Sequence, residues 1–63
     1  MPVIKIDIWE GKDKETKKKL IKSVSKAVSE SLDIPIEWVH VVLVESPKDN
    51  WGINGEQASE LYK

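Results

Sequence analysis

The chain has 63 residues and a formal charge of −1, from ten lysines and eleven acidic residues, with no arginine, no cysteine and one histidine. This composition excludes a disulfide, leaves too few ligands for a structural zinc ion and gives no reason to expect a nucleic-acid partner. A chain this short buries only about 60% of the surface that its unfolded form exposes, so self-association is the expected source of additional stability.

Residues 3–9 alternate between apolar and other side chains, which is the pattern of a β-strand. Ile4, Ile6 and Ile8 share one face of this strand and give it a strongly apolar side. Gly11 ends the strand, and Asp13 is well placed to cap a following helix.

Residues 14–32 carry apolar side chains at steps of one, three and four, which form a single stripe on a helix. The stripe consists of Leu20, Ile21, Val24, Ala27, Val28 and Leu32. Asp33 and Pro35 end the helix, because proline disfavours helical geometry in the residue before it.

Residues 39–44 read VHVVLV, a nearly continuous apolar run that is typical of a strand buried on both faces. Strand, helix and strand in this order predict a βαβ unit with parallel strands and a right-handed crossover. One helix covers only one face of a two-stranded sheet, so the other face must meet a second copy of the chain.

The remaining residues are rich in turn formers, with Pro47, Gly52, Asn54 and Gly55, and predict a short hairpin followed by one helical turn over residues 58–62. The predicted fold class is α/β, of the mixed α+β kind, in a single oligomeric domain spanning residues 1–63. No apolar run approaches 18 residues, so no membrane span is expected. With no secretory signal in view, we expect a cytoplasmic location.

The usual catalytic arrangements are missing from the sequence. There is no thiol, no G-x-S-x-G motif near His40 and no phosphate-binding loop. What remains is Pro2, whose nitrogen becomes a secondary amine if Met1 is removed. An α-amino group titrates near pH 8, and burial or a neighbouring cation lowers its pKa, so it can act as a base. With Met1 in place this nitrogen is a tertiary amide, so the mechanism depends on removal of Met1.

Five features together resemble the 4-oxalocrotonate tautomerase family over residues 2–59. They are the Pro-Val-Ile start, Glu10-Gly11-Lys12, the amphipathic helix, Val39-His40-Val41 and the segment NWGINGE at residues 50–56. The resemblance implies βαβ subunits assembled as homohexamers, built as trimers of dimers. It also implies an isomerase that needs no cofactor or metal. Such an enzyme moves a proton between the enol and keto forms of a small acid, through a 1,3- or 1,5-shift.

The resemblance assigns Pro2 as the catalytic base. Lys12 stands where the family has an arginine that polarises the substrate carboxylate, and His40 stands where the family has a second arginine. Arginine grips a carboxylate through two parallel hydrogen bonds, whereas lysine is a point charge and a neutral imidazole donates one bond. We therefore expect Lys12 and His40 to serve a dicarboxylate poorly.

Three tryptophans complete the expected substrate-binding set. The resemblance implies that Trp51 shields the site and lowers the pKa of the proline, and that Trp9 and Trp38 lie near the pocket. A pocket with one cation and extra tryptophan favours a phenylpyruvate-like enol acid over a dicarboxylate, although a 2-hydroxy-dienoate also fits the family. The tryptophans could instead anchor subunits to one another.

Alternative interpretations stay open at this point. Lys12 could be a solvated loop lysine, and His40 a packed interface residue. The protein as a whole could be a catalytically degenerate binding module or a purely structural oligomer.

Overall fold

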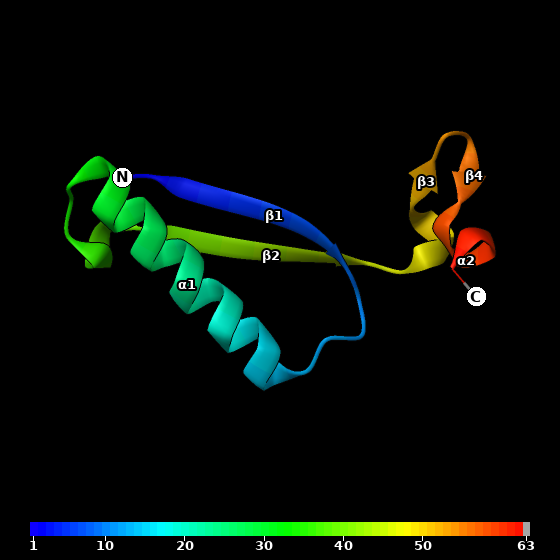
Figure 1. The fold of residues 1–63 in the computed structure, drawn as a ribbon, viewed down its shortest axis with the longest axis horizontal. Coiled ribbons are helices and arrows are strands. Elements are labelled where there is room, and N and C mark those ends of the chain that lie inside the picture. Colours follow the sequence, from blue (N-terminus) through cyan, green and yellow to red (C-terminus); the bar gives the residue numbers. More distant parts are fainter. Residues whose placement is uncertain (63) are drawn as a thin grey trace.

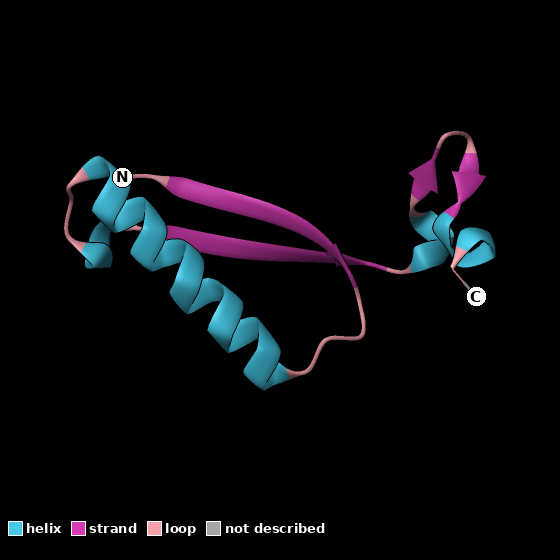
Figure 2. Cartoon of the chain, viewed as in Figure 1, coloured by secondary structure: helices cyan, strands magenta, loops and turns pink. Residues whose placement is uncertain are grey.

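The computed structural model describes residues 1–62 (Figure 1). Its elements, in chain order, are β1 (Val3–Trp9), α1 (Lys14–Leu32), the 3-10 turn η1 (Ile36–Trp38), β2 (His40–Ser46), the 3-10 turn η2 (Lys48–Asn50), β3 (Gly52–Ile53), β4 (Glu56–Gln57) and α2 (Ala58–Leu61). Figure 2 shows the two long strands side by side, with α1 along one face and a small hairpin at the far end. The βαβ unit and the C-terminal hairpin are therefore confirmed.

The strand β2 has different bounds from those predicted, which were residues 39–44. Its first ladder residue is His40, because Val39 caps η1 by donating its backbone N–H to the carbonyl of Ile36 at 3.0 Å. The strand also continues through Glu45 and Ser46, which pair with the last two residues of β1. The apolar pattern missed this extension because neither residue is hydrophobic.

The strands β1 and β2 run parallel, in a register from Val3 opposite His40 to Trp9 opposite Ser46. Backbone hydrogen bonds extend the pairing at each end, from His40 to Pro2 and from Glu10 to Ser46, both at 3.0 Å. The register places Ile4, Ile6 and Ile8 opposite Val41, Leu43 and Glu45, so these residues share one face of the sheet.

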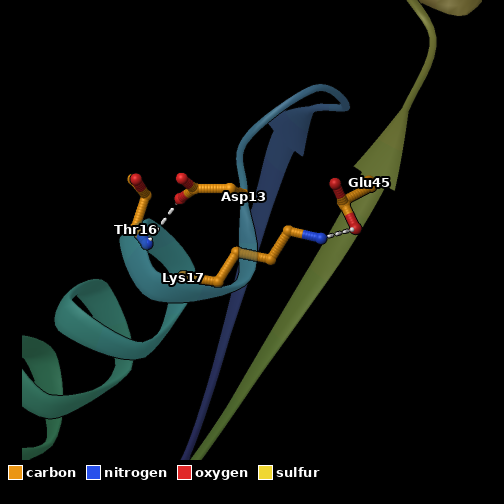
Figure 3. A network of polar contacts seen from close by, with 4 residues as sticks. All are labelled: Asp13, Thr16, Lys17 and Glu45. Atoms are coloured by element: carbon orange, nitrogen blue, oxygen red, sulfur yellow. Dashed lines mark hydrogen bonds and ion pairs between the residues drawn. The ribbon is translucent and has the colours of Figure 1, made fainter.

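The helix α1 has the predicted bounds, and both ends are capped. At its start the Asp13 carboxylate accepts a hydrogen bond from the backbone N–H of Thr16 at 2.8 Å (Figure 3). At its end Asp33 adopts a left-handed conformation with φ of 54°. The hydroxyl of Ser29 donates to the carbonyl of Ile34 at 2.6 Å and closes the last turn.

One ion pair joins α1 to the sheet. The Nζ of Lys17 lies 2.7 Å from Oε1 of Glu45, and Figure 3 shows the lysine reaching from the first turn of the helix to the strand. This contact identifies the face that α1 covers as the one that carries Ile4, Ile6 and Ile8. Since both side chains are partly exposed, the pair contributes less than about 1 kcal/mol.

The opposite face of the sheet has no covering layer within the chain. It carries Val3 and Val42, which are 64% and 46% exposed. In the single chain one face of β2 is therefore open, because α1 supplies only one layer. Burial of both faces of this strand stays a prediction for the assembled protein.

The shape of the chain is extended. Figure 1 shows β3, β4 and α2 beyond the end of the long strands, away from α1. The radius of gyration is 14.5 Å, against about 11 Å for a compact domain of this length. The accessible surface is 5033 Å², against roughly 4,100 Å² for a compact monomer of this mass. Among residues 1–62, Ala58 is the one buried hydrophobic residue, so the single chain leaves most of its apolar surface for a partner.

Candidate active site

The first group of predicted site residues lies where β1 begins. Pro2 is half-buried, and its carbonyl accepts the His40 backbone N–H. His40 is exposed and pairs with Val3, and Trp38, in η1 just before it, is 49% exposed. The structure therefore brings Pro2, Trp38 and His40 to the same end of the sheet.

The second group lies at the opposite end, where β1 finishes. Trp9 is the last residue of β1, and Lys12 is exposed in the loop that leads to α1. Gly11 makes this loop possible, because its φ of 116° belongs to a region that side-chain-bearing residues rarely adopt. Trp51 follows η2, and its ring centroid lies 6.0 Å from that of Trp9.

The length of β1 separates the two groups. At about 3.3 Å per residue, the strand holds its first and last residues roughly 20 Å apart. Figure 1 shows the N-terminus and the C-terminal hairpin at opposite ends of the long strands. Pro2 therefore cannot meet Lys12 or Trp51 of its own chain, and a site that contains all three needs residues from more than one subunit.

An aromatic cluster surrounds Trp9. Its ring meets Trp51 edge-on at an interplanar angle of 82°, and the Tyr62 ring lies 5.4 Å away at 47°. The ammonium of Lys48 lies 5.0 Å from the centroid of the Trp9 ring, within the range of a cation–π interaction. The indole Nε1 of Trp9 is buried and has no hydrogen-bond partner among the described residues.

Sequence reasoning missed Lys48 and Tyr62. Lys48 lies three residues before Trp51, and this spacing could have drawn attention to it. Tyr62 had no such signal, because only the return of the hairpin brings α2 back to Trp9.

A hollow of about 410 Å³ is lined by Lys14, Lys17, Lys18 and Ile21, all on α1, and includes no predicted site residue. Within residues 1–62 no group of three or more His, Cys, Asp or Glu side chains is arranged to hold a metal ion. No helix in this range is long and apolar enough to cross a membrane.

Comparison with known proteins identifies the family. The family profile described as tautomerase enzyme matches residues 2–60, which is nearly the whole chain. The chain belongs to the tautomerase family. A 2-hydroxymuconate tautomerase from Pseudomonas putida is 51% identical to this tautomerase over 63 residues, covering 100% of both chains.

Solved structures agree with this assignment. A 4-oxalocrotonate tautomerase isozyme from Methylibium petroleiphilum has a TM-score of 0.93 and 37% identity, covering 98% of this chain and 100% of its own. The heterohexamer 4-oxalocrotonate tautomerase from Chloroflexus aurantiacus has a TM-score of 0.92 and 30% identity, covering 97% of this chain and 98% of its own. The tautomerase is therefore an isomerase that interconverts enol and keto forms, and the predicted resemblance is confirmed.

Proposed function

We propose that this tautomerase interconverts the enol and keto forms of a small 2-hydroxy acid, with Pro2 as general base after removal of Met1. We propose further that it acts as a homo-oligomer, a hexamer built as a trimer of dimers, in which each site draws on several subunits. The single observation that supports the shared site is the separation of Pro2 from Lys12 and Trp51 by the length of β1. The Chloroflexus aurantiacus relative is a heterohexamer, in keeping with such an assembly.

The proposed reaction starts at the Pro2 nitrogen. The neutral amine takes the proton of the enol hydroxyl, and the electron pair moves through the conjugated system to a carbon two or four bonds from the hydroxyl oxygen, which corresponds to a 1,3- or a 1,5-shift. The prolinium then returns the proton to that carbon, so that the base is restored and the keto acid leaves. The hydrogen bond from His40 to the Pro2 carbonyl holds the amine at a fixed place, which favours both transfers.

The neighbouring side chains tune this base and hold the substrate. Lys12 from another subunit would attract the substrate carboxylate and, as a nearby cation, lower the pKa of the amine. His40 would donate one hydrogen bond to the substrate, and Trp51 would cover the amine and exclude water. Trp38 lies beside His40 and would bound the pocket at the Pro2 end.

The proposed substrate class depends on which cationic side chains can hold the substrate carboxylates. The Pseudomonas putida relative is named for 2-hydroxymuconate, a dicarboxylate, so a 2-hydroxy-dienoate is the first candidate. This chain has no arginine, so it lacks a bidentate grip on either carboxylate. We expect it to accept a phenylpyruvate-like monocarboxylate enol at least as well as a dicarboxylate, since Lys12 supplies one cation.

The test begins with the intact mass of the purified protein, which must show loss of Met1. Ketonisation of 2-hydroxymuconate and of enol-phenylpyruvate is then followed by ultraviolet absorbance for the wild type and for Pro2→Ala. Loss of activity in Pro2→Ala, with the assembly intact by sedimentation, supports the proposal. Full activity in protein that retains Met1 would disprove the amine-base mechanism, and a strong dicarboxylate preference would contradict the expected substrate range. The cytoplasmic location and the single domain over residues 1–63 stay predictions.

A further inference from the structure

The C-terminal segment, residues 47–62, has a narrow connection to the rest of the chain. It continues from the end of β2 and folds mainly on itself, through the β3–β4 pairing and the bond from the Ala58 N–H to the Trp51 carbonyl at 2.7 Å. Figure 1 shows it projecting past the end of the sheet. Its aromatic contacts with the βαβ unit all involve the ring of Trp9, which meets both Trp51 and Tyr62.

Trp9 is well placed to fix the position of this segment relative to the sheet. Its backbone is fixed in the β1–β2 ladder opposite Ser46, so its ring projects from the rigid part of the fold. Lys48, Tyr62 and Trp51 then contact the ring from the C-terminal segment. Edge-to-face and tilted aromatic pairs have preferred geometries, so these contacts define an orientation as well as a position.

We propose that Trp9 is a positioning residue which, clamped by Tyr62 and Lys48, sets the orientation of the Trp51 ring over the Pro2 amine of another subunit. The inference rests on the proposed function, because it assumes that Trp51 covers that amine. It assigns Trp9 a role without substrate contact, in place of the direct one expected from sequence. Tyr62 and Lys48 act through Trp9.

The proposal has a specific signature in the pH profile. A ring that excludes water from an amine disfavours the charged form and lowers the pKa of the amine. If Trp51 loses its orientation, water reaches the amine and its pKa rises. The acidic limb of kcat/KM against pH then moves to higher pH. Loss of global stability alone would not move this limb.

The decisive comparison is Tyr62→Leu with Tyr62→Phe. The leucine removes the ring that packs on Trp9, whereas phenylalanine keeps it. For Tyr62→Leu we expect kcat/KM at neutral pH to fall about three- to tenfold, the range of one aromatic pair, with the acidic limb moved to higher pH. Tyr62→Phe should retain the wild-type profile. Near-ultraviolet circular dichroism should report a changed Trp9–Trp51 arrangement in the leucine variant alone.

Two further variants keep the inference testable if the Tyr62→Leu protein fails to assemble. Lys48→Met keeps the aliphatic stem and removes the cation over the Trp9 ring, so it should move the acidic limb in the same direction by a smaller amount. Trp9→Leu removes the ring that all three contacts share, so it should move the acidic limb at least as far as Tyr62→Leu does. An unchanged pH profile and unchanged kcat/KM in both Tyr62→Leu and Lys48→Met would overturn the inference, as would lowered stability with an unchanged profile. Failure of the proposed function would show instead as full activity in Pro2→Ala, where every member of the aromatic cluster is retained.

Discussion

His40 donates its backbone N–H to the carbonyl oxygen of Pro2 across 3.0 Å, which continues the β1–β2 ladder one residue beyond Val3. Pro2 is therefore held by the sheet although it precedes the strand. The bond uses only the Pro2 carbonyl, so it leaves the nitrogen unengaged. Because the bond also uses only the main chain of His40, the imidazole is free for a separate role and can be replaced without loss of this anchor.

Replacement of the imidazole tests what limits the substrate range. For His40→Arg we expect kcat/KM for 2-hydroxymuconate to rise about tenfold, because a charged hydrogen bond to a carboxylate is worth roughly 1.5–3 kcal/mol. The value for enol-phenylpyruvate should change little, since it has one carboxylate and Lys12 already serves it. His40→Gln is the matched control, with a donor of similar reach and no charge. An equal rise for both substrates would show that His40 does not select between them.

Subunit mixing tests whether the site is shared. Pro2→Ala and Lys12→Gln should each be nearly inactive alone, because one lacks the base and the other the cation that holds the carboxylate. After joint unfolding and refolding, some sites combine an intact Pro2 from one chain with an intact Lys12 from the other. If each site takes these residues from two different chains, random mixing restores about a quarter of the sites. No recovery above the separate variants would place both residues in one chain and contradict the separation seen along β1.

Much of the fold follows from sequence patterns. The alternation in residues 3–9 and the stripe in residues 14–32 gave the bounds of β1 and α1 correctly, because each pattern has a clear polar or glycine break at its ends. The capping role of Asp13 also followed from its position. The bounds of β2 were less accurate, since a 3-10 turn took Val39 and backbone pairing with β1 carried the strand into two polar residues.

The site was less accessible to sequence reasoning. Pro2 was singled out because the usual catalytic groups are missing, whereas Lys12 and Trp51 were selected through a family resemblance. Such a resemblance names residues without stating which chain supplies them. Their separation depends on the extended length of β1 and on the position of the C-terminal hairpin beyond the end of the sheet. No local sequence pattern predicts the packing of Tyr62 on Trp9, because these residues are 53 positions apart in the chain.

The open face of the sheet should control assembly. Val42 is 46% exposed in the single chain and faces away from α1, so a partner subunit would bury it. For Val42→Asp we expect dissociation of the oligomer and loss of activity, because an unpaired carboxylate is costly to bury. Ser23→Asp, on the exposed surface of α1, is the control with the same added charge. Sedimentation velocity measures the outcome, and a Val42→Asp protein that sediments like the wild type would exclude this face from the interface.

The cap at Asp13 should make stability depend on pH in acid. The hydroxyl and the backbone N–H of Thr16 hold the pKa of the Asp13 carboxyl below its usual value of 3.8. A carboxyl with a lower pKa in the folded state stabilises the fold above its unfolded pKa, and this contribution is lost as the pH falls through the folded value. Asp13→Asn keeps a neutral capping oxygen, whereas Asp13→Ala removes the cap. At pH 7 we therefore expect thermal midpoints, measured at one protein concentration, in the order wild type, Asn, Ala. As the pH falls below 3.8 the difference between wild type and Asn should shrink, and it should disappear once the pH has passed through the lower pKa of the folded state, while the difference between Asn and Ala should persist. A wild-type advantage over Asn that stays constant into strong acid would show that the charge of Asp13 does not contribute.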